Sequence, residues 1–243
     1  MSTVAVMLPR RGACGAGTCA RTARLLPLLA LAGCSFFTRS TPLPQIYVLD
    51  AAVPQAPAAT AAATAARVDP DPRAAQALPT LRLLRPLPAP GLDTERIAVL
   101  HPDGRLDYYT TGRWGAPVPE VIAEQALAQL RASGVWGAVA DPRDVFNTDY
   151  VLRMAISRFD AEYAAEGAAP TVQVALQCLL LRRRDGQPVA SFEAAGTADA
   201  AANRMGAVVA AFGAATHAAL AAVAERLGQV VQNPDRPVAS MNR

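Results

Sequence analysis

The segment that decides the fold is TVQVALQCLLLRRRDGQPVASF, which runs from Thr171 to Phe192. Its first half alternates large apolar side chains with mostly polar or small ones, a pattern typical of a β-strand with one buried face. Asp185 and Gly186 then form a turn, and Pro188 to Gly196 reads as the return strand. The segment therefore predicts an antiparallel hairpin. The side chains expected on its buried face are those of Val172, Val174, Leu176, Cys178 and Leu180.

The sequence on either side of this hairpin extends the sheet and covers it. Residues 150–163 read as a third strand, so three neighbouring strands would form an antiparallel meander. Residues 201–231 read as a helix whose large apolar side chains fall on one stripe, while most of its remaining surface is alanine. A membrane-spanning helix would be apolar all round. We therefore interpret this helix as covering one face of the sheet, with a membrane span as the less favoured alternative.

Residues 80–139 predict a second group of elements. Leu81 and Leu83 mark one strand, and residues 97–100 and 106–110 form a hairpin around the turn at residues 101–104. A loop that holds Trp114 follows this hairpin. Prolines 117 and 119 open a helix that ends at Gly134, because proline is tolerated in a first helical turn and glycine is favoured just after a last one. A short strand over residues 135–139 completes the group. Together the elements predict an α+β fold, with a mainly antiparallel sheet covered by two helices in a single domain, which the N-terminal signal described next would place in the periplasm.

The N-terminal region has the pattern of a secretory signal. Residues 1–24 carry arginines and no acidic residue, and LLPLLALA at residues 25–32 is an apolar run too short to span a bilayer. The tetrapeptide Leu31-Ala32-Gly33-Cys34 resembles the lipobox of bacterial lipoproteins. That resemblance implies cleavage before Cys34, with a diacylglycerol on its sulfur and an N-acyl chain such as palmitate on its new amine. Several acyl chains together anchor a protein stably. Ser35 favours the outer membrane by resemblance to enterobacterial sorting.

These signals divide the chain into five parts. Residues 1–33 are the signal peptide that is removed, 34–44 a lipidated tether, and 45–232 the folded domain, which begins with a strand at residues 46–49. Residues 51–79 are rich in alanine and proline and carry little large apolar surface, so we expect a disordered loop there. Residues 233–243 are expected to be a flexible tail.

The charge of the expected mature chain does not argue for a nucleic-acid partner or an acidic substrate, and we expect no nucleic-acid partner. The full sequence has a net charge of +3, but four of its 23 arginines precede Cys34 and no acidic residue does. The mature chain would therefore hold 19 arginines against 20 carboxylates, which is close to neutral.

The sequence offers no constellation for catalysis or metal binding. There are only two histidines, and no spacing of His and Cys suits a metal ion. After loss of the signal and acylation of Cys34, Cys178 would have no disulfide partner, so we expect a buried, inert thiol. Asp141, Asp144 and Asp149 lie near Pro142 and are most simply turn and capping groups. We therefore expect no catalytic residue, no metal and no cofactor other than the covalent lipid.

The order of motifs resembles the ABC-type transport auxiliary lipoprotein family, the paraquat-inducible-type lipoproteins. The segments that carry the resemblance run from Cys34 almost to the C-terminus. In chain order they are IYVLD, LDTERIAVL, DYYTTGRWGAPVPEVIAEQALAQL, DYVLRMAISRFDAEY and the hairpin VQVALQCLLLRRRDGQPVASF, followed by the alanine-rich helix. Residues 93–96, Asp-Thr-Glu-Arg, stand where the family commonly has Asp-Arg-Pro. If that proline-containing turn helps to dock a partner, the departure puts this contact in doubt.

The resemblance implies a role in lipid transport across the envelope. Members of this family accompany mammalian-cell-entry-domain proteins and an ABC permease and ATPase, which move phospholipid or other apolar molecules between membranes. The auxiliary lipoprotein has no known catalysis and would be a docking or bridging component. The sequence leaves a homo-oligomer open. It also leaves two alternatives: a structural or outer-membrane assembly lipoprotein without a transporter, and a lipid-carrying pocket between helix and sheet.

Four side chains are candidates for contact with a partner or with lipid. Arg182 and Arg184 would lie on one face of a strand end and could contact lipid headgroups or an acidic partner, although a solvated hairpin end is the simpler interpretation. Tyr109 and Trp114 could form an aromatic patch for a partner. We favour packing in the core or in a loop for both of them.

Overall fold

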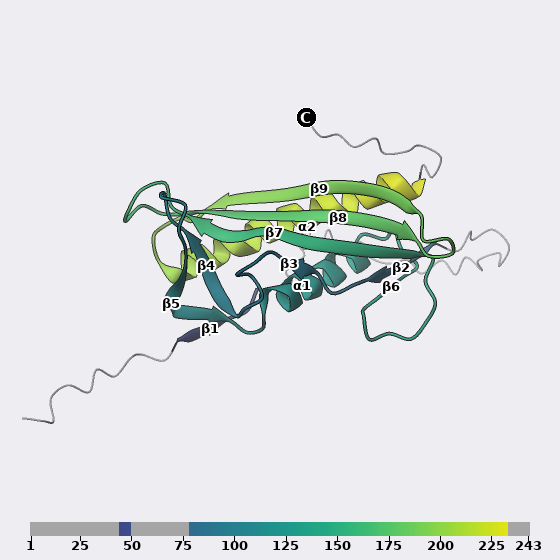
Figure 1. Ribbon diagram of the computed structural model, residues 1–243, viewed down its shortest axis with the longest axis horizontal. Helices are drawn as coiled ribbons and strands as arrows, with labels where there is room; N and C mark the ends of the chain where they lie inside the picture. Colours follow the sequence, from purple (N-terminus) through teal and green to yellow (C-terminus); the bar gives the residue numbers. More distant parts are fainter. Residues whose placement is uncertain (1–43, 50–77, 233–243) are drawn as a thin grey trace, which may run out of the picture. The chain divides into compact units, whose positions relative to one another are not determined.

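The computed structural model describes residues 44–49 and 78–232, and the following statements concern these residues (Figure 1). The predicted signal peptide, the lipobox with Cys34 and the C-terminal tail lie outside the described residues. So do the tether apart from Pro44 and the alanine- and proline-rich loop apart from residues 78–79.

The predicted three-stranded meander is confirmed. It consists of β7 (Tyr150–Glu162), β8 (Thr171–Arg182) and β9 (Pro188–Asp199), which are antiparallel throughout. The register places Cys178 between Met154 on β7 and Phe192 on β9. The alternation read from the sequence therefore corresponds to one buried face. The predicted side chains Val172, Val174, Leu176, Cys178 and Leu180 are all buried.

The long helix α2 (Met205–Gln232) covers this buried face. Its apolar stripe, which includes Val208, Phe212 and Leu220, is buried against β8 and β9. By length and composition α2 is also apolar enough to cross a membrane. The structure instead uses its apolar stripe to form the core of the domain, because the sheet removes those side chains from water.

Alanine and glycine on α2 and β9 let the helix approach the sheet closely. A Cβ atom built on Gly196 of β9 would lie 2.0 Å from the carbonyl oxygen of Ala215 and 2.7 Å from the amide nitrogen of Ala219. These neighbours are backbone atoms and cannot rotate away. The position therefore requires glycine, and the alanine-rich face of α2 has a packing role.

The predicted second hairpin is confirmed, but its second strand is longer than expected. β4 (Arg96–Leu100) pairs antiparallel with β5 (Leu106–Trp114), and β1 (Gln45–Tyr47) joins β5 in parallel. We predicted Trp114 in a loop after this hairpin, which is wrong, since it is the last residue of β5. Its amide donates to the carbonyl of Glu95, so pairing with distant residues extends the strand.

Short parallel strands complete the sheet. β2 (Thr80–Leu83) pairs with the start of β7 and with β6 (Ala138–Ala140), and β3 (Leu87–Pro88) pairs with the middle of β7. β4 is parallel to the end of β7. The sheet is thus mixed, with its longest pairings antiparallel.

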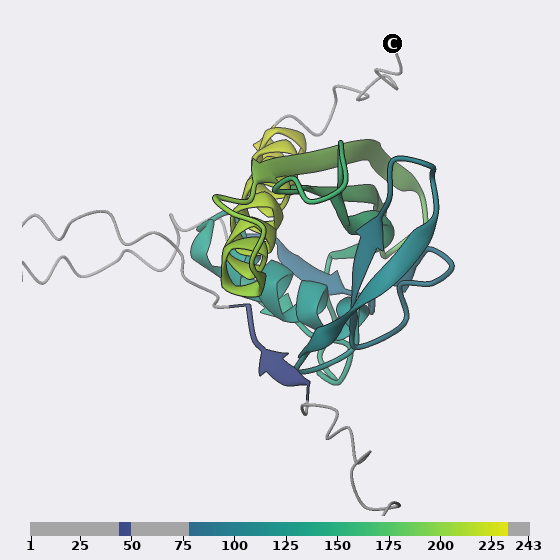
Figure 2. The same ribbon diagram turned by 90° about the vertical axis from the view of Figure 1, so that its left-hand side faces the viewer.

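The predicted first helix is confirmed as α1 (Val118–Ala132). Pro117 precedes it, and Gly134 with φ +68° follows Ser133 at its end. α1 contacts α2, and both helices lie on the same side of the curved sheet (Figures 1 and 2). The α+β fold class predicted from the sequence is therefore confirmed.

Candidate functional site

Trp114, a candidate for partner contact, lies in the core. Its side chain is 0% exposed, and its ring centroid is 5.7 Å from that of Phe159 and 5.1 Å from that of Phe212. These three rings fill the space between β5, β7 and α2. In this conformation Trp114 therefore cannot reach a partner, and packing in the core is its role in the structure.

Tyr109 lies at one end of the domain, where it joins three segments. Its hydroxyl oxygen is 2.8 Å from that of Tyr163, which in turn donates to Oδ1 of Asn203 at 2.7 Å. The chain of hydroxyls links β5 to the β7–β8 loop and to the segment before α2. Burial disfavours the phenolate and, together with the hydrogen bond to Tyr163, raises the pKa of Tyr109.

An open groove of about 610 Å³ borders this chain of hydroxyls. Its lining includes His101, Asp107, Tyr109, Tyr163 and Asn203. Within the described ranges, no group of three or more His, Cys, Asp or Glu side chains could hold a metal ion. The groove therefore presents hydrogen-bonding groups and aromatic edges rather than a coordination site.

Tyr109→Phe is expected to lower the free energy of unfolding by about 1 kcal/mol, because it removes a part-buried hydrogen bond and leaves the aromatic packing intact. Chemical denaturation of the purified domain would measure the change. Tyr108→Phe is the matched control: it removes a hydroxyl that donates to the carbonyl of Gly91 at the exposed surface, so its effect should be smaller. Equal losses in the two variants would contradict a special role for the Tyr109 hydroxyl.

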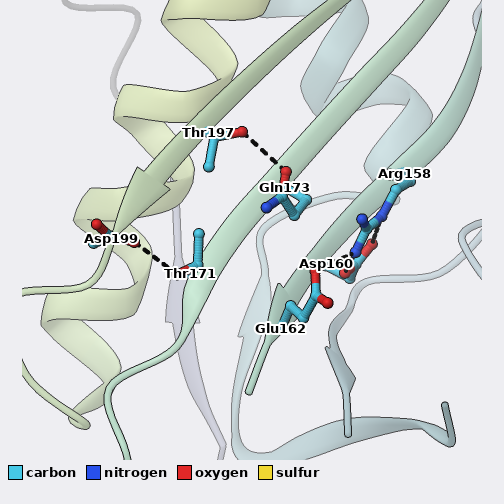
Figure 3. Close-up of polar contacts among 7 residues, drawn as sticks. All are labelled: Arg158, Asp160, Glu162, Thr171, Gln173, Thr197 and Asp199. Atoms are coloured by element: carbon cyan, nitrogen blue, oxygen red, sulfur yellow. Dashed lines mark hydrogen bonds and ion pairs between the residues drawn. The ribbon is translucent and has the colours of Figure 1, made fainter. Parts of the chain in front are cut away.

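A polar strip, which was not among the sites predicted from the sequence, crosses the sheet on the face away from α2 (Figure 3). We define the strip by residues of β7, β8 and β9 that form two cross-strand rows. Glu162, Thr171 and Asp199 lie in one row, and Asp160, Gln173 and Thr197 in the next. The hydroxyl of Thr171 donates to Asp199 at 2.6 Å, and that of Thr197 to Gln173 at 2.9 Å.

Arg158 organises the β7 side of this strip. Its guanidinium donates to Asp160 at 2.7 Å and to Glu162 at 3.0 Å. The two carboxylates, that of Asp160 first, raise the pKa of Arg158. Asp160 has only 9% of its side chain exposed, so this ion pair is partly shielded from water. The alternation of polar residues along each strand could have indicated a polar face. The register between the strands, which the sequence does not show, was needed to recognise that these residues lie side by side.

The candidate arginines lie beside the opposite end of β7. Arg182 is the last residue of β8, and Arg184 lies on the β8–β9 turn. Arg182 contacts Asp185 at 3.4 Å and Arg184 contacts the same carboxylate at 3.6 Å. The backbone amide of Gln187, with a smaller contribution from the two arginines, lowers the pKa of Asp185. The side chain of Arg184 is 77% exposed, whereas Arg182 is half-buried. Arg184 is thus the more accessible of the two.

The remaining candidate chemical groups have structural roles. Asp144 accepts from the amide of Asp141, and Asp149 accepts from both the amide and the hydroxyl of Thr80, whose hydroxyl lowers the pKa of Asp149 most. Cys178 is buried as predicted, and burial raises its pKa to about 12. Asp144, and Asp141 which accepts from the amide of Arg143, make the predicted local turn contacts, whereas Asp149 bonds to a residue far away in the sequence. The predicted burial of the Cys178 thiol matches the structure.

Cys178 should resist alkylation in the folded chain at neutral pH and react after unfolding, because only the thiolate is a good nucleophile. The raised pKa also stabilises the folded state fully below pH 9.0, and this contribution is lost as the pH rises through about 12. Denaturation between pH 8 and 11 would compare the wild type with Cys178→Ala. The free energy of unfolding should fall less with rising pH in the variant than in the wild type. The same fall in both proteins would contradict a raised pKa of Cys178 in the folded state.

The described residues thus define an α+β domain with a filled core, an open groove at one end and a polar strip across its sheet. The chain belongs to the family of ABC-type transport auxiliary lipoprotein components, which matches residues 47–224. The match includes strands β2 to β9 and most of α2, and it begins at Tyr47, whereas the sequence resemblance was traced from Cys34. Membership implies a place in the cell envelope in association with an ABC transport system.

Solved structures support the same fold. A DUF330-family protein from Xanthomonas campestris is 26% identical and superimposes with a TM-score of 0.56 over 65% of this chain and 86% of its own. The crystal structure of an uncharacterized protein, at 12% identity, gives a TM-score of 0.55 over 76% of this chain and 98% of its own, which shows likeness of fold alone. Among curated proteins, none matches this chain.

Proposed function

We propose that this chain is a non-catalytic auxiliary lipoprotein of a mammalian-cell-entry-type ABC transport system. Lipid on Cys34 anchors it to a membrane. The lipobox residues 31–33 direct cleavage before Cys34, and Ser35 directs the product to the outer membrane, facing the periplasm. There it assists a mammalian-cell-entry-domain protein and the permease and ATPase in moving phospholipid or other apolar molecules between the two membranes.

The observation that carries the proposal is the family match over residues 47–224. Within this range several titratable groups form structural contacts. Asp160 and Glu162 form ion pairs with Arg158, Asp149 accepts a hydrogen bond from the Thr80 hydroxyl, and Cys178 is buried in the core. Such an arrangement favours a docking component over an enzyme.

The filled core favours docking over carriage of a lipid within the domain. A lipid-carrying pocket between α2 and the sheet would need a continuous apolar channel. In the described residues this space holds Trp114, Phe159 and Phe212, each 0% exposed. The groove near Tyr109 opens outward, and its lining mixes apolar surface with hydrogen-bonding groups, so it is not an enclosed apolar channel. We therefore propose that the chain contributes surfaces to the transport system rather than a binding cavity for the cargo.

Crosslinking in intact cells tests the proposal. The lipidated chain would be recovered through a C-terminal tag and its partners identified by mass spectrometry. Recovery of a mammalian-cell-entry-domain protein, with loss of that protein in Cys34→Ala, would support the proposal. Cys178→Ala is the matched control, since it makes the same substitution in the core and leaves the anchor intact. Recovery of outer-membrane assembly components without any transporter subunit would overturn the proposal in favour of a structural lipoprotein.

A further inference from the structure

The loop between β6 and β7, residues 141–149, presents two apolar side chains to water. Val145 is 98% exposed and Phe146 is 43% exposed. Large apolar side chains are usually removed from water in a folded domain, and adjacent exposed ones mark contact surfaces. In Figure 1 the loop lies below the sheet on the right, beside β6.

Hydrogen bonds to distant segments fix the conformation of this loop. Arg82 of β2 donates to the carbonyls of Asp144 at 2.9 Å and Phe146 at 2.6 Å. Arg183 of the β8–β9 turn donates to the side chain of Asn147 at 2.7 Å. The loop is therefore held in the shape that exposes Val145 and Phe146. A surface that is ordered before contact loses less entropy on binding.

The charge around the loop is positive. Residues 80–83, 138–153 and 180–188 hold six arginines against four aspartates. Among the described residues, neither Arg143 nor Arg183 forms an ion pair with a carboxylate, and Arg184 is largely exposed. The aspartates Asp141 and Asp144 instead accept from backbone amides of the loop itself.

The opposite end of β7 carries the opposite charge. Residues 98–110, 158–171 and 197–206 hold six carboxylates against three arginines. β7 has 13 residues, so these two ends are about 40 Å apart. This separation gives the domain an electrical polarity, with the apolar loop at its positive end. An anionic surface would orient the domain with Val145 and Phe146 toward it.

We propose that the loop at residues 141–149 contacts the surface of an anionic lipid bilayer. Val145 and Phe146 insert at the boundary between headgroups and acyl chains, and Arg143, Arg183 and Arg184 bind the lipid phosphates, as arginine suits phosphate geometry. This contact is separate from the lipid on Cys34. It orients the domain on a membrane through a second attachment point and does not depend on a transport partner.

A fluorescent probe at position 145 tests this contact in the full, lipid-anchored chain. An environment-sensitive fluorophore would be attached through Val145→Cys, because Cys178 is buried and has a raised pKa. The protein would be reconstituted in vesicles of phosphatidylcholine, with or without about one third phosphatidylglycerol, an anionic share large enough to give a negative surface potential. Nitroxide-labelled lipids then quench the probe only if it reaches the bilayer, and acrylamide quenches it only from water.

We expect nitroxide quenching and a blue shift at position 145 in the anionic vesicles, with both reduced by Arg143→Gln combined with Arg184→Gln. A probe attached through Leu106→Cys is the matched control, since Leu106 is 42% exposed at the acidic end and should stay open to acrylamide. Absence of nitroxide quenching at position 145 in anionic vesicles would overturn the proposal. So would shielding of position 145 that requires a transporter subunit, which would identify the loop as a protein contact.

Discussion

Gly196→Ala is expected to lower the free energy of unfolding by about 3 kcal/mol. The new methyl group would lie 2.0 Å from the carbonyl oxygen of Ala215, so either α2 or β9 must move. A shift of α2 would disturb its packing along the whole sheet, because the core is close-packed. Thermal unfolding followed by circular dichroism would measure the change, and a fall of about 10 °C in Tm is expected for a domain of this size.

Gly213→Ala is the matched control for this prediction. Gly213 lies within α2, and a Cβ atom there would have no neighbour within 4 Å. Replacement of glycine by alanine in a helix interior should stabilise the domain by about 0.5–1 kcal/mol. Opposite signs are therefore expected for the same substitution at two glycines. Equal effects would show that close approach of α2 to β9 is not what requires Gly196.

Trp114→Ala is expected to destabilise the domain by about 3–5 kcal/mol, since it removes a fully buried aromatic side chain and leaves a cavity beside Phe159 and Phe212. Chemical denaturation would measure the loss. Trp114→Phe should cost much less, because it keeps a ring in place and the indole Nε1 has no hydrogen-bond partner among residues 44–49 and 78–232.

This comparison also separates a packing role from a role in partner binding. If Trp114 contacted a partner directly, Trp114→Ala would keep its stability and lose crosslinking to that partner. The burial of Trp114 predicts instead that Trp114→Ala destabilises the folded domain, so that any loss of crosslinking follows from the loss of folding. Unchanged stability of Trp114→Ala would contradict the placement of this side chain in the core.

The parts of the fold that depend on local patterns could be predicted from the amino-acid sequence. Alternation over residues 171–182 specified which face of β8 is buried, because successive side chains of a strand point to opposite faces. The apolar stripe of α2 likewise specified the face that meets the sheet. Prolines 117 and 119 and Gly134 bounded α1 through their own backbone preferences. None of these features required knowledge of a distant segment.

Features that depend on pairing between distant segments could not be predicted in this way and became visible in the three-dimensional structure. The parallel pairing of β2, β3 and β4 along β7 brings together residues far apart in the chain, and short strands carry too few side chains to specify such partners. Pairing with β1 and with Glu95 extended β5 to Trp114, and packing against Phe159 and Phe212 buried its side chain. The polar strip needed the register of three strands, and the bonds from Arg82 and Arg183 to the loop at residues 141–149 needed contacts across the sheet. Tertiary contacts therefore determined the candidate surfaces, because each surface is assembled from segments whose local sequences are independent of one another.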